Sequence, residues 1–364
     1  MSYLSGQANN KQIKFVRIVS ILNRGDCLID IEKENDILGY LKEKKLIETN
    51  NSVQVKRLGG GVSCKVIQIK TNNSSFVIKQ ALSKLRVKDN WYSDRSRIIT
   101  ERRCLATYYK IIPEYVPKVL YYDDSNYLFV MESASSESMP WKSLLLNGKI
   151  DYHVGEKVAY ALARVHEVSS RDYLIKKQFE DDSFFIELRI EPYLETIKGR
   201  HPALDQSIQD AIDYLLNHKT VLVHGDYSPK NILVSDNGIF ILDFEVAHWG
   251  NPVFDLAFLT NHLLLKSVKN KKWKVSYLKM MLFLMNTYFK YRPFVNREEM
   301  EAKTVHVLAL LFLARVDGKS PAEYITEEKD KDIIRELSYS ILENKYSNFQ
   351  QLVNLFTDYL NNKR

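Results

Sequence analysis

A predicted β-hairpin flanked by polar side chains constrains the fold of this chain more than any other part of its sequence. Residues 232–234 and 239–242 are short apolar runs, and the Ser-Asp-Asn-Gly between them is typical of a tight turn. Asn231 comes directly before the first run and Asp243 directly after the second. Because the outer ends of a hairpin lie side by side, we expect these two side chains to be close together.

A third apolar run, residues 220–223, predicts a strand that leads to His224 and Asp226. A nucleoside triphosphate brings several negative charges, and Mg²⁺, which selects carboxylate and amide oxygens, holds its reacting end. Asn231 and Asp243 are therefore predicted metal ligands. Asp226 precedes Asn231 by five residues. It lies on the connecting loop, where we expect it to face an acceptor hydroxyl as the catalytic residue.

The ordered set H-G-D-x-x-x-x-N at residues 224–231, followed by D-F-E at 243–245, resembles the aminoglycoside phosphotransferase and choline kinase superfamily. The D-x-E form is most similar to its methylthioribose-kinase-like small-molecule kinases. The resemblance implies an α+β, bilobal, protein-kinase-like fold that binds nucleotide between a strand-rich lobe and a mainly helical lobe. The alternative is that these polar residues only cap loops.

Length and pattern agree with two lobes. A chain of 364 residues exceeds what one core usually holds. Strand-like segments dominate before about residue 133, so we expect a nucleotide-binding lobe over residues 1–133 and a catalytic and acceptor-binding lobe over 134–364. Residues 31–47 are predicted to add a helix to the first lobe. The helices predicted for the second lobe cover residues 152–168, 184–197, 204–216, 254–265, 277–291 and 305–315.

Three further polar residues are expected to support the hairpin. Glu245 is a predicted metal ligand, because residues 243 and 245 face the same side if the chain stays extended. A solvated, outward carboxylate is the alternative. The resemblance to the family's F-D-I/L motif implies that Asp255 braces the catalytic loop, and a helix N-cap would equally explain an aspartate there. The same resemblance gives His224 a supporting role.

The nucleotide phosphates are expected to contact a glycine-rich turn between two alternating segments, residues 53–57 and 64–69. Adjacent glycines let the backbone approach phosphates closely and adopt positive φ. The run departs from the G-x-G-x-x-G of protein kinases, and a simple glycine-rich hairpin turn is the alternative. The predicted phosphate-binding residues are Gly59, Gly60, Gly61 and Ser63.

Lys79 ends a predicted strand, residues 75–79, whose alternation places Phe76 and Ile78 on one face and Lys79 on the other. The resemblance implies that this lysine pairs with a glutamate, and Glu101, in the helical stretch 94–109, is the candidate. A surface ion pair on a solvated helix is the alternative. The resemblance also makes residues 126–131 the strand before the hinge. The predicted adenine contacts are the backbones of Glu132 and Ala134.

Net charge and cysteine content narrow the possible partners and cellular location of the protein. A net charge of +7 is modest, and the lysines gathered over residues 266–274 are expected to form a solvated face, so nucleic-acid binding is not expected. The N-terminus is polar and the longest apolar stretches are too short to span a bilayer, which predicts a soluble protein without a membrane segment. Three widely spaced cysteines indicate reduced thiols and a cytoplasmic location.

The acceptor is predicted to be a small hydroxylated metabolite. Only about ten residues separate Phe244 from Asp255, with no A-P-E motif, which leaves little room for the activation segment of a protein kinase. Methylthioribose-like sugars, amino alcohols such as choline, and aminoglycosides remain open, and the basic balance argues against a polycationic drug. Arg315, at the end of an apolar helix, is the predicted acceptor contact, with charge complementarity at a helix C-terminus as the alternative.

A cationic acceptor would need carboxylates, and the candidates are Glu187, Glu191, Glu195 and Asp205. ATP is the expected donor, with GTP as the alternative. A nucleotide-binding module without catalysis is the second class of function. The presence of Lys79, Asp226, Asn231 and Asp243 together speaks against it, because a chain without catalysis has no chemical need for the complete set.

Overall fold

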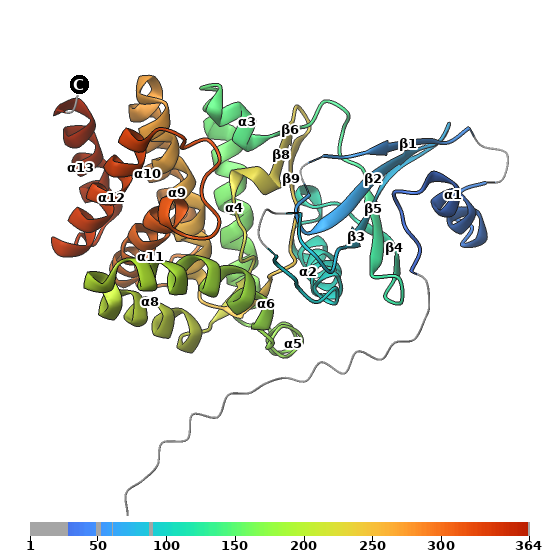
Figure 1. Ribbon diagram of the computed structural model, residues 1–364, viewed down its shortest axis with the longest axis horizontal. Helices are drawn as coiled ribbons and strands as arrows, with labels where there is room; N and C mark the ends of the chain where they lie inside the picture. The colour runs from blue at the N-terminus through green and yellow to red at the C-terminus, as the bar shows by residue number, and fades with distance from the viewer. Residues whose placement is uncertain (1–27, 49–51, 60, 87–89, 363–364) are drawn as a thin grey trace, which may run out of the picture.

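The computed structural model describes residues 28–48, 52–59, 61–86 and 90–362 (Figure 1). Cys27, Gly60 and the polar N-terminal segment considered above lie outside these residues. A five-stranded antiparallel sheet forms the N-terminal part, and most of the remaining chain is helical. The two parts lie side by side in Figure 1. The predicted α+β architecture, strand-rich first and mainly helical afterwards, is confirmed.

The sheet has the strand order β1-β2-β3-β5-β4. Alternation along β3 divides its side chains between two cores: Phe76 and Ile78 pack in one, and Val77 packs in the other. This confirms the predicted alternation and leaves Lys79 on the side of Val77. The strands are β1 (Gln54–Arg57), β2 (Cys64–Lys70), β3 (Ser75–Ala81), β4 (Val119–Asp123) and β5 (Leu128–Glu132).

Two helices accompany this sheet. α1 (Glu34–Glu43) buries Ile37 and Leu41, which are one turn apart, in the same core as Phe76. It is shorter than the predicted helix over residues 31–47, because Lys45 adopts a φ of 57° just after it ends. α2 (Arg97–Ile111) overlaps the stretch 94–109 predicted to be helical, begins three residues later and ends two residues beyond it, and it contributes to the other core.

The central hairpin forms as predicted. β8 (Ile232–Ser235) pairs with β9 (Gly238–Ile241), and Ser235 lies opposite Gly238. A 3₁₀ turn, η4 (Pro229–Asn231), comes directly before β8. The neighbouring pairs are β7 (Val221–Val223) with β10 (His248–Gly250) and β6 (Met139–Pro140) with β8.

The helical part packs around three long helices that are largely buried. α9 (Pro252–Lys269), α10 (Lys274–Lys290) and α11 (Arg297–Asp317) contain the segments predicted as buried helices. Their apolar residues face neighbours on several sides, as expected for helices inside a core. The other helices are α3 (Trp141–Leu146), α4 (Tyr152–Ser169), α5 (Tyr173–Gln178), α8 (Asp205–Asn217), α12 (Glu328–Glu343) and α13 (Phe349–Asn362), with short 3₁₀ turns η1 (Pro113–Tyr115), η3 (Pro202–Leu204) and η5 (Lys271–Trp273).

Residues 184–197 do not form the single α-helix that we expected. The chain instead forms α6 (Ser183–Phe185), the π-helix η2 (Ile186–Glu195) and α7 (Thr196–Arg200). Pro192 lies inside the π-helix. A proline has no N–H to donate and its ring clashes with the carbonyl four residues earlier, so the wider hydrogen-bond pattern relieves a conflict that an α-helix would contain.

The lysines over residues 266–274 do not share one solvated face. Lys266 lies in α9 and is fully buried, which contradicts the expectation. Cys64 and Cys104 are both buried and free. Within the described residues, no helix combines the length and the hydropathy that crossing a bilayer requires.

Candidate active site

The loop that carries Asp226 is fixed by a buried carboxylate. Asp255, on the first turns of α9, accepts hydrogen bonds from the backbone N–H groups of His224 at 2.8 Å and Gly225 at 2.9 Å. Gly225 has a φ of 77°, and a Cβ there would lie 2.8 Å from Val246. Only glycine fits this turn without strain. The sharp turn therefore presents Asp226 at a defined position.

Asp255 is not the N-cap of its helix. Asn251 caps α9, since its side chain accepts from the N–H of Val253. The Asp255 carboxylate also contacts His166, whose other ring nitrogen lies 2.9 Å from the hydroxyl of Tyr288. Burial acts to raise the pKa of Asp255, but its hydrogen bonds with His166 and the loop outweigh burial and lower it. An ionised carboxylate thus holds the loop.

Asp226 forms an ion pair that the sequence did not predict. The Nη2 of Arg189 lies 2.9 Å from its Oδ2, and the Nε of Arg189 donates to the Gly225 carbonyl at 2.8 Å. Arg189 lies in the π-helix η2. Side chains there do not follow the 3.6-residue spacing of the α-helix that we predicted, so the sequence did not indicate where Arg189 points. Two donors on one guanidinium hold both the carboxylate and its backbone, so the Asp226 side chain has a defined orientation.

The two predicted metal ligands lie on neighbouring ends of the hairpin strands. The backbone N–H of Leu242, the residue before Asp243, donates to the Asn231 carbonyl at 2.9 Å. The Nδ2 of Asn231 donates to the Asp226 carbonyl at 3.1 Å, which leaves its side-chain oxygen without a hydrogen bond among the described residues. Asp243 has a φ of 73° and shares one oxygen with Lys79.

The charge state of Asp243 suits a magnesium ligand. Burial acts to raise the pKa of Asp243, but Lys79, Lys230 and Arg189 outweigh it and hold the pKa below its usual range. One ionised carboxylate and one amide oxygen, each with lone pairs to spare, are hard donors of the kind that Mg²⁺ prefers. Asn231 and Asp243 therefore fit the ion.

Lys79 joins the sheet to both α2 and the hairpin. Its Nζ lies 2.6 Å from Glu101 Oε1 and 2.5 Å from Asp243 Oδ1. Glu101 is only 2% exposed, so a surface ion pair is excluded. Burial acts to lower the pKa of Lys79, but Asp243 and Glu101 outweigh it and hold the pKa well above its usual range. The lysine is thus a fixed cation between two carboxylates.

The chain from Asp243 to Glu245 is not the extended segment that we expected. The positive φ of Asp243 and the turn at residues 245–246 break the extended chain on which the prediction rested. Glu245 instead accepts from the Nε of Arg97 at 3.1 Å. This carboxylate is neutralised by a guanidinium, which argues against its predicted role as a metal ligand.

Arg97 uses all of its five N–H donors and is fully buried. Besides Glu245, it donates to the Ser63 carbonyl at 2.5 Å, to the Leu82 carbonyl at 2.7 Å and to two carbonyls at the start of α2. Ser63 closes the glycine-rich turn, so one side chain connects that turn, α2 and the loop after β9. No pattern in the sequence indicated this role.

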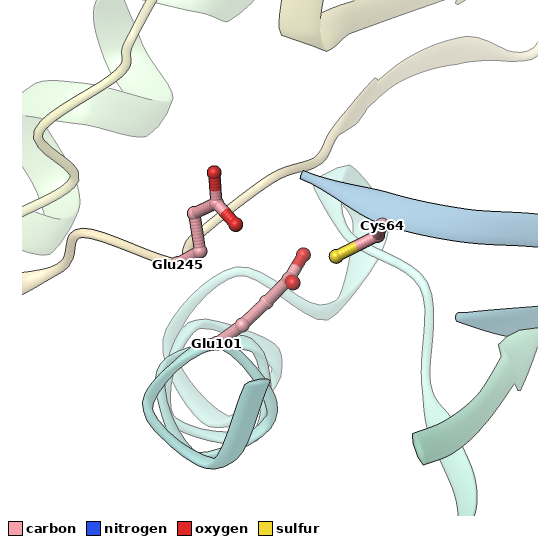
Figure 2. A group of neighbouring side chains, drawn as sticks. All are labelled: Cys64, Glu101 and Glu245. Carbon is pink, nitrogen blue, oxygen red and sulfur yellow. The ribbon is translucent and has the colours of Figure 1, made fainter. Parts of the chain in front are cut away.

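Cys64, Glu101 and Glu245 also come close to one another, and Figure 2 shows their side chains converging from β2, α2 and the loop after β9. Their potential ligand atoms all lie within 4.8 Å of one another. Burial raises the pKa of the Cys64 thiol, so it stays protonated and is a poor ligand. Both carboxylates are already paired with cations. The group is best explained as a buried polar contact.

The glycine-rich turn differs from its expected geometry. Neither Gly59 nor Gly61 has a positive φ, and Gly60 lies outside the described residues. Position 61 still has no space for a side chain, because a Cβ there would lie 2.6 Å from the Cys64 carbonyl. Ser63 is buried beside Cys64. The turn is therefore tight, as close approach to phosphates requires.

At the predicted hinge, the two backbone groups differ. The N–H of Glu132 already donates to the Lys118 carbonyl at 3.0 Å. The N–H of Ala134 donates to none of the described residues, so it remains available to a ligand.

The predicted acceptor contact, Arg315, is buried, and its Nη1 donates to the hydroxyls of Tyr193 at 3.0 Å and Ser320 at 3.2 Å.

Comparison with known proteins gives a consistent result. A sequence model of the phosphotransferase enzyme family matches residues 54–267. The methylthioribose kinase of Bacillus mycoides (strain KBAB4) is 24% identical over 278 residues, which cover 67% of this chain and 69% of that protein. The methylthioribose kinase of Geobacillus thermodenitrificans (strain NG80-2) is 27% identical over 221 residues, and the match spans only 55% of its length.

Solved structures show the same fold. The choline kinase of Cryptosporidium parvum Iowa II superposes with a TM-score of 0.58 at 13% identity, covering 88% of this chain and 99% of that one. At this identity the likeness concerns the fold alone. The predicted protein-kinase-like arrangement is confirmed by it.

Proposed function

The chain belongs to the phosphotransferase enzyme family, and we propose that it transfers the γ-phosphoryl group of ATP to a hydroxyl of a small metabolite. The family expected from the motifs is confirmed. The observation that carries the proposal is the network in which Lys79 bridges Glu101 and Asp243 beside the braced Asp226 loop. It brings the cation for the phosphates and the acceptor-facing carboxylate into one connected site.

Each side chain has a separate task in this proposal. Lys79 neutralises charge on the nucleotide phosphates, together with the backbone of the glycine-rich turn. The free N–H of Ala134 meets the adenine edge. Asp226 orients the acceptor hydroxyl for in-line attack and takes its proton late, since the transition state for phosphoryl transfer is loose and needs little help from a base.

Asn231 and Asp243 would hold Mg²⁺. When bound, the ion would supply positive charge that offsets the negative charge of the phosphates during transfer. Glu245 is outside this set, because it pairs with Arg97. Asp255 and His224 position the Asp226 loop through the backbone contacts described above.

The acceptor is a small molecule in this proposal. The loop between β9 and α9, residues 242–251, packs β10 against β7 and leaves no room for the activation segment of a protein kinase. The sequence relatives are named as methylthioribose kinases, which favours a hydroxylated metabolite. Two free thiols, with no disulfide among the described residues, are consistent with work in the cytoplasm.

The test is the replacement Asp226→Asn in the full chain, which keeps the shape of the side chain. We expect phosphoryl transfer to fall by about 10²–10⁴-fold, while the Kd for ATP with Mg²⁺ stays within about twofold. Transfer is measured with γ-labelled ATP over a panel of hydroxylated metabolites, and binding by calorimetry.

Asp236→Asn is the matched control, because Asp236 is exposed in the hairpin turn. It should change neither quantity. Full turnover in Asp226→Asn would remove Asp226 from the catalytic role. Mg²⁺-dependent ATP binding without transfer to any acceptor would instead favour a nucleotide-binding module.

A further inference from the structure

A second group of buried polar residues lies in the helical part of the chain, outside the network of Lys79 and Asp226. We call Lys266, Arg315 and Tyr324 the cationic cluster. They come from α9, from α11 and from the loop over residues 318–327. α9 and α11 pack against each other, so the cluster is built on two rigid helices.

The cationic cluster is connected to Asp226 by side chains in contact. Arg189, the partner of Asp226, has its Cζ 5.9 Å from the ring centroid of Phe258. The Phe258 ring lies 5.9 Å from the Tyr193 ring, and the Tyr193 hydroxyl accepts from Arg315. The cluster is therefore linked to Asp226 through three packed side chains, those of Arg189, Phe258 and Tyr193.

Lys266 is buried without an anionic partner. It is fully inaccessible, and its Nζ donates to the His262 carbonyl at 3.1 Å. It forms no ion pair with any described residue, and the ring centroid of Tyr324 lies 5.1 Å away. The nearby carboxylate, Glu323, is paired with Lys142 instead. Two of the three ammonium donors of Lys266 thus remain unused.

One edge of the Arg315 guanidinium makes no hydrogen bond to the described residues. Its Nη1 donates to Ser320 and Tyr193, whereas its Nε is buried with no partner among the described residues. Its Nη2 likewise makes no hydrogen bond to them. The Nε–Nη2 edge of a guanidinium matches the two oxygens of a carboxylate or phosphate. The hydroxyl of Tyr324, also buried and unpartnered, adds a further donor.

The charges here do not balance. Three basic side chains, those of Lys142, Lys266 and Arg315, face one carboxylate, that of Glu323. Burial lowers the pKa of Lys266 to about 7, with Lys142 and Arg315 adding to the shift and Glu323 opposing it. His262 adds no charge, because burial and Lys266 lower its pKa well below the usual value. Unpaired buried charge is costly, and a bound anion would offset it.

We propose that the acceptor carries an anionic group, a carboxylate or a phosphate, which binds to Lys266, Arg315 and the Tyr324 hydroxyl while its own hydroxyl faces Asp226. This rests on the proposed kinase function and specifies its substrate class. Of the four carboxylates considered for a cationic acceptor, Glu191, Glu195 and Asp205 are exposed, and Glu187 is half-buried with one oxygen that has no hydrogen-bond partner among the described residues. They offer a cationic acceptor one half-buried anion, fewer buried charged groups than the cationic cluster offers to an anionic one.

The first arm of the test measures phosphoryl transfer from ATP to matched pairs that differ by one charged group: glycerol with glycerate, glucitol with gluconate, and ribose with ribose 5-phosphate. We expect the charged member of at least one pair to have a kcat/KM about tenfold or more above its neutral partner, as charge-assisted hydrogen bonds provide. The first two pairs test a carboxylate and the third tests a phosphate.

The second arm measures binding of glycerate, gluconate and ribose 5-phosphate to the full chain by calorimetry at pH 8, in two buffers of different ionisation enthalpy. An anion that binds Lys266 should draw a proton onto it, because the lysine is mostly neutral at that pH. The variants are Lys266→Met, which should abolish the proton uptake, and Arg315→Lys, which keeps the charge but loses the side-on edge.

Lys269→Met, one turn of α9 beyond Lys266, is the matched control and should behave as the unmodified chain. Both test variants should weaken anion binding about tenfold or more. Transfer to neutral acceptors as fast as to charged ones would overturn the inference and leave the proposed function standing. If no acceptor in the panel is phosphorylated, anion binding with proton uptake that Lys266→Met abolishes still supports the site. Absence of anion binding at millimolar concentrations overturns it.

Discussion

The nucleotide side and the acceptor side of the site treat buried cations in opposite ways. Lys79 and Arg97 each contact a buried carboxylate. Among the described residues, Lys266 and Arg315, which are equally buried, donate hydrogen bonds only to carbonyl and hydroxyl groups. In the first region each buried cation has a carboxylate partner, whereas in the second region neither has one in the part of the chain that the structure describes. Removing a cation should therefore destabilise one region and stabilise the other.

Lys79→Met should have the largest effect, because it leaves Glu101 and Asp243 buried without a cation. We expect a loss of about 3–5 kcal/mol in the free energy of unfolding and a fall of about 10²–10³-fold in phosphoryl transfer. Urea unfolding and a transfer assay measure the two quantities. Lys56→Met, on the exposed strand β1, is the control. Unchanged stability of Lys79→Met would contradict the conclusion that the carboxylates on the nucleotide side depend on their buried cation.

Arg97→Lys should have the next largest effect. Lysine cannot replace five donors in a planar arrangement, so Glu245 and several backbone carbonyls lose partners. We expect about 2–4 kcal/mol of destabilisation. The KM for ATP should rise more than kcat falls, because the Ser63 carbonyl at the end of the glycine-rich turn is released. Equal changes in both constants would indicate a purely structural role.

The stability of the unmodified chain should rise with pH between about 7 and 10 through Lys266. Its folded pKa of about 7 lies below the ordinary 10.5, so the unfolded chain binds more protons in that window. The slope from this residue is at most about 1.4 kcal/mol per pH unit. Lys266→Met should lose this slope and be more stable than the unmodified chain below pH 7. Parallel pH profiles of the two proteins, from urea unfolding, would contradict the acceptor-side half of the comparison.

Cys64→Ala should have the smallest effect. The thiol is protonated and lies within 4.8 Å of the Glu101 and Glu245 carboxylates, which already have cationic partners. Its removal should cost about 1 kcal/mol for the small cavity and leave the Mg²⁺ dependence of transfer unchanged. A shift in metal dependence would show that Cys64, Glu101 and Glu245 bind an ion after all.

The part of the site that could be predicted depends on residues close together in the chain. The spacing around the hairpin placed Asp226, Asn231 and Asp243 near one another, and strand alternation directed Lys79 away from Phe76. No sequence pattern predicts the positive φ of Asp243. This φ invalidated the prediction that Glu245 would follow Asp243 in an extended chain.

Side chains whose partners are distant in the chain were missed. Arg97 reaches Glu245 across 148 residues, and the π-helix around Pro192 changes the spacing that would have directed Arg189. Lys266 did carry a signal that went unused. It follows three leucines within an apolar helix, where a solvated lysine would have been out of place.

The five hydrogen bonds of Arg97 and the two ion pairs of Lys79 have a consequence for control of this enzyme. Protein kinases are often switched by swinging the helix that corresponds to α2 away from the catalytic residues. In this chain α2 is joined to the glycine-rich turn and the loop after β9 through Arg97, and to β3 through the ion pair of Glu101 with Lys79. A swing of α2 would therefore have to break the contacts of both Arg97 and Lys79, which makes such an on–off rearrangement costly in this chain.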